Sequence, residues 1–152
     1  MDRERASAHT SERLADLQKL TEENGIFEHV TFTGPVDTDT KTSLFRGSLF
    51  NVAPSRYEGW CIAAMEASAA GKAVVGTRIP GLQDAVRHEE TGLLAEAENV
   101  DEIADAIRRL ITDGELRNRL GREGRRWAER FTWDNIASAQ EQVYREVVET
   151  RG

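Results

Sequence analysis

Apolar residues along the chain form short runs separated by segments with helical periodicity, a pattern that predicts alternating strands and helices. Three short buried strands are predicted at Leu49–Ala53, Lys72–Thr77 and Thr91–Ala95. A fourth, His29–Thr33, alternates β-branched and aromatic residues until a Gly-Pro pair interrupts it. Strands that alternate with helices form βαβ units. We therefore expect an α/β, Rossmann-like parallel sheet with helices on both faces.

The segments before and between these strands carry helical signals. The first expected helix has Leu14, Leu17 and Leu20 on one face, begins at Thr10 or Ser11 and stops at Asn24-Gly25. Shorter helices are expected near residues 40–46, 62–70 and 81–86. Residues 1–10 are polar and lack periodicity, so we expect a frayed or disordered lead at 1–10 and one domain at 11–152.

Three further helices are predicted after the last strand. Asn99 with Glu102 resembles a capping box at the start of the first. The second follows Gly114, and Thr132 is expected to cap the third. On this last helix the residues expected on the buried side are Ile136, Val143 and Val147.

The segment Pro54–Gly71 is the candidate binding site. Its pattern predicts a turn after a strand, followed by a helix of small residues. In a parallel sheet this arrangement places the helix N-terminus at the carboxyl edge of the sheet. Such helix ends bind anions. Glu58 precedes the helix and Glu66 lies about one turn inside it, and carboxylates accept strong hydrogen bonds from hydroxyl groups. A nucleotide sugar supplies both phosphate and hydroxyls.

Composition narrows the function classes. The chain has 152 residues, 39% of them hydrophobic, and a formal net charge of −7. This is typical of a globular domain and argues against a nucleic-acid partner, which needs clustered Lys and Arg. Cys61 is the only cysteine, which excludes an intramolecular disulfide and a Cys-based zinc site and fits a reducing cytoplasm. The sequence predicts neither a signal peptide nor a transmembrane segment.

Two glutamates separated by seven residues, Glu58 and Glu66, match an E-x7-E pattern. Together with other blocks in the same order, this pattern resembles the retaining GT-B glycosyltransferases of family 4, the group 1 glycosyl transferases. The blocks are Val30–Gly34, Pro54-Ser55, Glu58-Gly59, Glu66-Ala67, Gly71–Val75, Pro80–Leu82, Thr91–Leu94 and Phe131–Trp133.

The resemblance implies a C-terminal, donor-binding domain for a nucleoside-diphosphate sugar. It assigns Glu58, as the catalytic candidate, to the donor sugar hydroxyls and Glu66 to the ribose. The residues between them that would face the sugar and diphosphate are Gly59, Trp60, Cys61 and Ile62. Candidate contacts to the base are Gly34, Pro35 and Val36. The resemblance implies neither a metal nor another cofactor, and the sequence offers no Asp-x-Asp pair or histidine cluster.

The chain also departs from the family pattern. Cys61 follows Trp60 where relatives often have glycine, and Asp84 stands where glutamate is common. Two earlier strands with their Arg/Lys pair, and the acceptor-binding N-terminal half, are absent, so we expect an N-terminally truncated fragment that is inactive alone. Its expected partners are the missing half or a second chain. The early strand should pair with Leu49–Ala53 or meet a second chain at the exposed sheet edge.

Alternative interpretations stay open. The chain could be a non-catalytic relic or assembly module of the same fold, or another enzyme such as a nucleotide-sugar epimerase, although it lacks a suitable histidine and arginine constellation. Cys61 is expected to be a small buried residue, Trp60 either covers the donor or fills a gap, and Arg56 is expected at the surface. The expected location is cytoplasmic, peripheral to a membrane in an intact enzyme.

Overall fold

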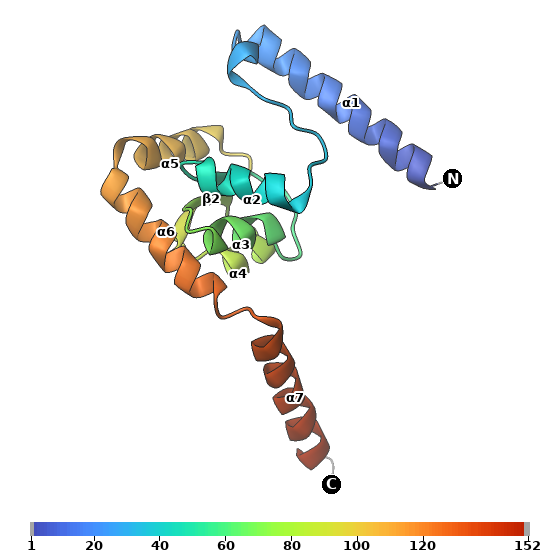
Figure 1. Ribbon diagram of the computed structural model, residues 1–152, viewed down its shortest axis with the longest axis vertical. Coiled ribbons are helices and arrows are strands. Elements are labelled where there is room, and N and C mark those ends of the chain that lie inside the picture. The colour runs from blue at the N-terminus through green and yellow to red at the C-terminus, as the bar shows by residue number, and fades with distance from the viewer. Residues whose placement is uncertain (1, 151–152) are drawn as a thin grey trace. The chain divides into compact units, whose positions relative to one another are not determined.

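The computed structural model describes the backbone of residues 2–150 and the side chains of residues 12–150 (Figure 1). The chain divides into two compact units, Met1–Val36 and Asp37–Gly152. Each unit is described by itself. The expected division into a lead at 1–10 and a domain at 11–152 stays a prediction, and Met1 and the side chains of 2–11 lie outside the described part.

The first unit consists of helix α1 (Asp2–Glu23), a 3-10 turn η1 (Phe27–His29) and an irregular segment to Val36. The expected helix is present, although it begins earlier than Thr10. Its C-terminus follows the sequence signal: Gly25 adopts a φ of 67°, and the amide of Ile26 donates to the Thr21 carbonyl at 2.9 Å. A positive φ favours glycine at this position because glycine has no Cβ.

The prediction of a strand at His29–Thr33 is wrong. His29 ends the 3-10 turn, and Val30–Thr33 has no strand assignment. Val30 is extended, with φ −117° and ψ 125°, but an extended segment becomes a strand only when a neighbour accepts and donates its ladder hydrogen bonds. The sheet of the second unit has three strands and not the expected four. Pairing with a second chain stays a prediction.

The second unit is built on a parallel sheet. After helix α2 (Thr38–Gly47), its strands are β1 (Asn51–Ala53), β2 (Val74–Thr77) and β3 (Gly92–Ala95), in the order β1-β2-β3. Val52 pairs with Val75, and Val75 pairs with Leu93. The three later strands predicted from the sequence are therefore confirmed, each at shorter bounds.

Helices cover both faces of this sheet, as the fold class requires. They are α3 (Ile62–Ala69), α4 (Pro80–Ala85), α5 (Val100–Thr112) and α6 (Gly114–Ala128). The last helix, α7 (Trp133–Thr150), has no buried residue. One core cluster joins α3 and α4 to the side chains of Val74 and Leu94. The other joins α5 and α6 to Val75 and Leu93, which point to the opposite face because strand side chains alternate. The α/β fold class is confirmed.

Close packing of α6 against α3 depends on glycine. A Cβ at Gly121 would lie 2.2 Å from the carbonyl oxygen of Gly71, and one at Gly124 would lie 3.4 Å from the Ser68 hydroxyl. Gly71 itself ends α3 with a φ of 76°. These contacts fix the C-terminal end of α3, and thereby the direction in which its N-terminus points.

Side-chain caps begin the last three helices. The Asn99 side chain accepts from the Glu102 amide at 3.2 Å, and Thr132 accepts from the Asn135 amide at the same distance, as predicted. Asp113 caps α6 through the Leu116 amide at 2.8 Å, which the sequence analysis did not identify.

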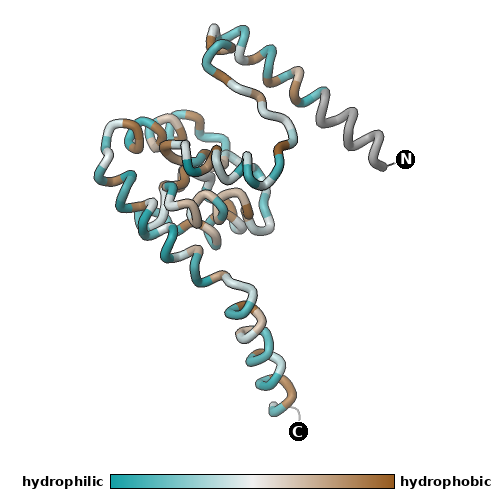
Figure 2. Tube along the Cα trace, viewed as in Figure 1, coloured by the Kyte–Doolittle hydropathy of each residue, from teal (hydrophilic) through white to brown (hydrophobic). Residues whose placement is uncertain are grey.

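Helix α7 differs from the expectation in its burial. Ile136, Val143 and Val147 were expected on a buried side, but their side chains are exposed, by 44%, 53% and 47%. Apolar and polar positions alternate along the helix as its periodicity indicates (Figure 2). The periodicity therefore predicted the apolar stripe correctly. Its predicted burial is wrong, because the described residues of this unit do not cover the stripe.

Candidate functional site

Glu58 lies in the turn that follows β1 and is positioned by three segments. Its carboxylate accepts a hydrogen bond from the Ser55 hydroxyl at 2.9 Å. The Ser55 carbonyl in turn accepts from the Thr77 hydroxyl at the end of β2. A Cβ at Gly81, in the first turn of α4, would lie 2.2 Å from the Glu58 carbonyl oxygen, so α4 also packs directly on this turn. Glu58 thus lies at the carboxyl ends of β1 and β2, where the sequence predicted it.

The N-terminus of α3 begins at Cys61. The Cys61 side chain is 3% exposed, which confirms the expected small buried residue, and it makes no capping hydrogen bond. The Cys61 carbonyl accepts from the Met65 amide at 3.2 Å, so the helix proper starts here. The amides of the first turn have no partner within an α-helix and carry partial positive charge. The side chain of Ile62, which opens this turn, is exposed.

Glu66 forms an ion pair that the sequence analysis missed. The Nζ atom of Lys41, on α2, lies 2.6 Å from the Glu66 carboxylate, and the two side chains are 41% and 37% exposed. Arg56 is exposed, as predicted, and pairs with Glu98 at 3.2 Å. No sequence signal connects residues 25 positions apart on different helices, so only the fold reveals Lys41.

Two cavities share the Glu66 side chain as part of their walls. One, of about 740 Å³, is mainly apolar and includes Trp60, Ile62 and Met65 together with the aromatic rings of Phe131 and Trp133. The other, of about 360 Å³, contains Lys41, Arg46 and Arg125. Of the predicted site residues, Trp60, Ile62 and Glu66 meet in the larger cavity, whereas Glu58, Gly59 and Cys61 do not line it.

Trp60 shows features of both roles considered for it. Its ring centroid lies 5.1 Å from that of Phe131, a tilted aromatic contact, so it fills space against the end of α6. It also remains 37% exposed and contributes to the larger cavity wall. It can therefore present an aromatic surface to a ligand while the Phe131 contact holds it in place.

Gly34, Pro35 and Val36 belong to the first unit. Gly34 adopts a φ of 61°, and its carbonyl accepts from the Thr33 hydroxyl at 3.2 Å. The predicted contact of Gly34, Pro35 and Val36 with a base stays a prediction.

Among the residues that the structure describes, no three His, Cys, Asp or Glu side chains gather as a metal would need. Within the same residues, no helix combines the length and hydropathy of a membrane span.

The family model described as "Glycosyl transferases group 1" matches residues 10–127. The chain belongs to this family. It is 34% identical over 134 residues to the D-inositol 3-phosphate glycosyltransferase of Corynebacterium urealyticum, covering 88% of this chain and 32% of that protein. It is 35% identical over 133 residues to the GDP-mannose-dependent alpha-(1-6)-phosphatidylinositol monomannoside mannosyltransferase of Mycobacterium tuberculosis, covering 82% and 34%.

Solved structures agree with this assignment. Sucrose-phosphate synthase from Thermosynechococcus elongatus superposes with a TM-score of 0.79 at 32% identity, covering 88% of this chain and 34% of that one. Anabaena HepE in complex with UDP gives a TM-score of 0.76 at 20% identity, covering 91% and 37%, which shows the fold alone. The chain spans about a third of the length of the relatives it matches.

Proposed function

We propose that this chain is the donor-binding part of a retaining glycosyltransferase and binds a nucleoside-diphosphate sugar at the N-terminus of α3. In the intact enzyme, a sugar would pass from the donor to an acceptor hydroxyl with retention of anomeric configuration. Glu58 would orient the donor sugar and Glu66 the ribose. The first-turn amides of α3, from Cys61 and Ile62 onward, would stabilise the leaving diphosphate through electrostatic preorganisation.

The position of Glu66 is the observation that carries the proposal. A half-exposed carboxylate at the wall of a largely apolar cavity, beside Trp60, can accept hydrogen bonds from a diol while the ring contacts an apolar face. The cation that now pairs with it, Lys41, lies at the border of the second cavity, where Arg46 and Arg125 add positive charge suited to phosphate.

The names of relatives support the same chemistry. The mycobacterial relative is named as a GDP-mannose-dependent mannosyltransferase, and the corynebacterial one as a glycosyltransferase of an inositol phosphate. A nucleotide sugar is therefore the donor class that we propose here. The segment that these relatives share with this chain contains Glu58 and Glu66, but it covers about a third of their length. We propose that this chain alone does not complete the transfer.

The Glu66→Gln variant tests the role of this carboxylate. Because a hydrogen bond to a charged acceptor contributes about 1.5–3 kcal/mol, loss of the charge should weaken nucleoside-diphosphate binding about tenfold or more. Isothermal titration with UDP, GDP and ADP measures this change.

Glu141→Gln is the matched control. Glu141 is also a helical glutamate with one basic partner, Arg145 at 2.7 Å, and it lies on α7. Its substitution should leave nucleotide affinity unchanged. Equal affinity of the Glu66→Gln variant and the unmodified chain would contradict the assignment of Glu66 and favour the non-catalytic module of the same fold.

A further inference from the structure

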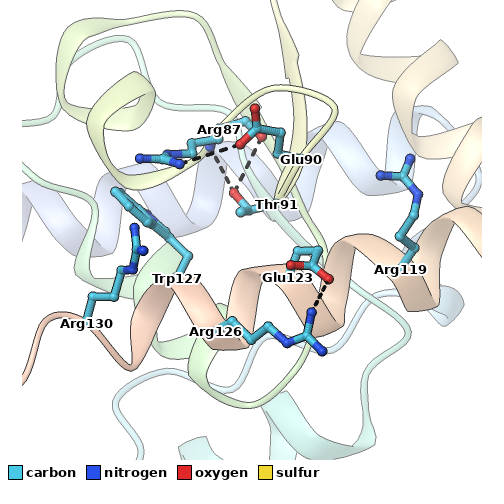
Figure 3. Close-up of a pocket in the computed structure, with 8 residues that line it drawn as sticks. All are labelled: Arg87, Glu90, Thr91, Arg119, Glu123, Arg126, Trp127 and Arg130. Atoms are coloured by element: carbon cyan, nitrogen blue, oxygen red, sulfur yellow. Dashed lines mark hydrogen bonds and ion pairs between the residues drawn. The ribbon is translucent and has the colours of Figure 1, made fainter.

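A third cavity, separate from the two beside Glu66, has a volume of about 360 Å³ and is lined by four arginines from two parts of the chain (Figure 3). Arg87 follows α4, whereas Arg119, Arg126 and Arg130 come from α6 and the turn after it. Thr91, which also lines the cavity, directly precedes β3 at the amino edge of the sheet. Glu58 follows the carboxyl end of β1, so this cavity is distinct from the candidate donor site.

Trp127 holds two of these guanidinium groups in place. Its indole nitrogen donates to the Ala85 carbonyl at 3.0 Å, which fixes the ring. The guanidinium carbon of Arg87 lies 3.8 Å from the ring centroid and that of Arg130 lies 5.6 Å from it. Cation–π contacts restrict these long side chains before any ligand arrives. Less conformational entropy is then lost when they bind an anion.

Two glutamates in the cavity wall offset only part of the positive charge of the arginines. Glu90 lies 3.6 Å from Arg87, and Glu123 lies 2.7 Å from Arg126. Both pairs are exposed and three residues apart in sequence, a type of ion pair that contributes little and that an anion can displace. No carboxylate lies within ion-pair distance of Arg130 among residues 12–150.

We propose that this cavity binds a phosphomonoester dianion. Four guanidinium groups against two carboxylates leave two positive charges, which match a dianion better than a monocarboxylate. The planar fork of arginine donates paired hydrogen bonds to phosphate oxygens. The volume accommodates a phosphate with a small organic group. This excess of positive charge is local, because the chain as a whole carries a net charge of −7.

The test is a titration of the full chain with inorganic phosphate at neutral pH and constant ionic strength, followed by heteronuclear NMR. The indole resonance of Trp127, assigned with a Trp127→Phe variant, reports on the cavity. A saturable shift is expected. Arg130→Gln should weaken binding about tenfold, because a charged hydrogen-bond donor is lost. Arg108→Gln, an exposed arginine of α5 paired with Asp105, should leave binding unchanged.

Two further titrations distinguish the source of the phosphate. A hexose monophosphate represents a soluble ligand, and phosphatidylcholine vesicles containing phosphatidate represent a lipid headgroup. Binding of either that depends on Arg130 supports the proposal and identifies the source. Absence of a saturable shift up to about 20 mM phosphate, far above a millimolar Kd, together with no vesicle binding, would overturn it. So would equal affinity in the folded Arg130→Gln variant.

Discussion

At the scale of single residues, Glu58 is positioned by close backbone packing as well as by its own hydrogen bond. Ser55 donates to its carboxylate, while Gly81 allows α4 to approach its carbonyl. The sequence predicted Glu58 and Glu66 as candidate site residues, and it predicted the burial of Cys61, which the structure confirms. It did not identify Lys41, because an ion pair between distant helices leaves no local pattern.

Gly81→Ala tests this packing. A Cβ at 2.2 Å from the Glu58 carbonyl oxygen must displace backbone, and overpacking of this kind costs about 1–3 kcal/mol. Urea denaturation should show a loss in the free energy of unfolding within that range. Gly114→Ala is the control, since its nearest atom is the flexible end of Arg117 at 3.4 Å, and it should be neutral or stabilising. Unchanged stability of Gly81→Ala would refute the contact.

Glu89 makes folding stability depend on pH. A side-chain hydrogen bond from Arg109, at 2.9 Å, lowers the pKa of Glu89 from its usual 4.5. Because the pKa is lower in the folded state, the pair stabilises the fold above about pH 4.5, and this contribution is lost as pH falls through the folded value. Both side chains are about half exposed, so the contribution at neutral pH is below about 1 kcal/mol.

The Glu89→Gln variant separates this contribution from the rest of the acid response. Its loss of stability, measured by urea denaturation, should be detectable at neutral pH and should vanish in acid, where the carboxyl of the unmodified chain is protonated. A loss of equal size at both pH values would show that the Arg109 pair is not its cause.

At the scale of elements, local signals were sufficient where an element carries its own cap and apolar face. Helices α5, α6 and α7 and the strands β1, β2 and β3 formed where their patterns indicated, although only β2 and β3 are buried. His29–Thr33 did not form a strand, because alternation favours an extended backbone but does not supply a partner edge. The same holds for the apolar stripe of α7, because its periodicity predicts an apolar face but does not predict which surface packs against it.

Asn99→Ala tests the cap of α5. Removal of the side chain that accepts from the Glu102 amide should cost about 1 kcal/mol of stability, the usual value for an N-cap. Asn118→Ala, at an exposed position inside α6, is the matched control and should be neutral or slightly stabilising because alanine favours helices. Thermal unfolding compares the two variants. Similar melting temperatures for both would argue against the cap.

At the scale of the whole molecule, the chain is part of a group 1 glycosyltransferase fold and spans about a third of its relatives. The order of the sequence blocks predicted this family, and all of them except Val30–Gly34 lie in the strands, turns and helices of the second unit.

The central claim is that α3 presents a nucleotide-sugar site, and amide chemical-shift mapping of the unmodified chain tests it most directly. UDP, GDP and ADP, and then their sugars, are titrated to millimolar concentration. The account predicts saturable shifts concentrated at Gly59–Glu66, with one nucleotide bound more tightly than the others. No shift in that segment with any of these ligands would contradict it.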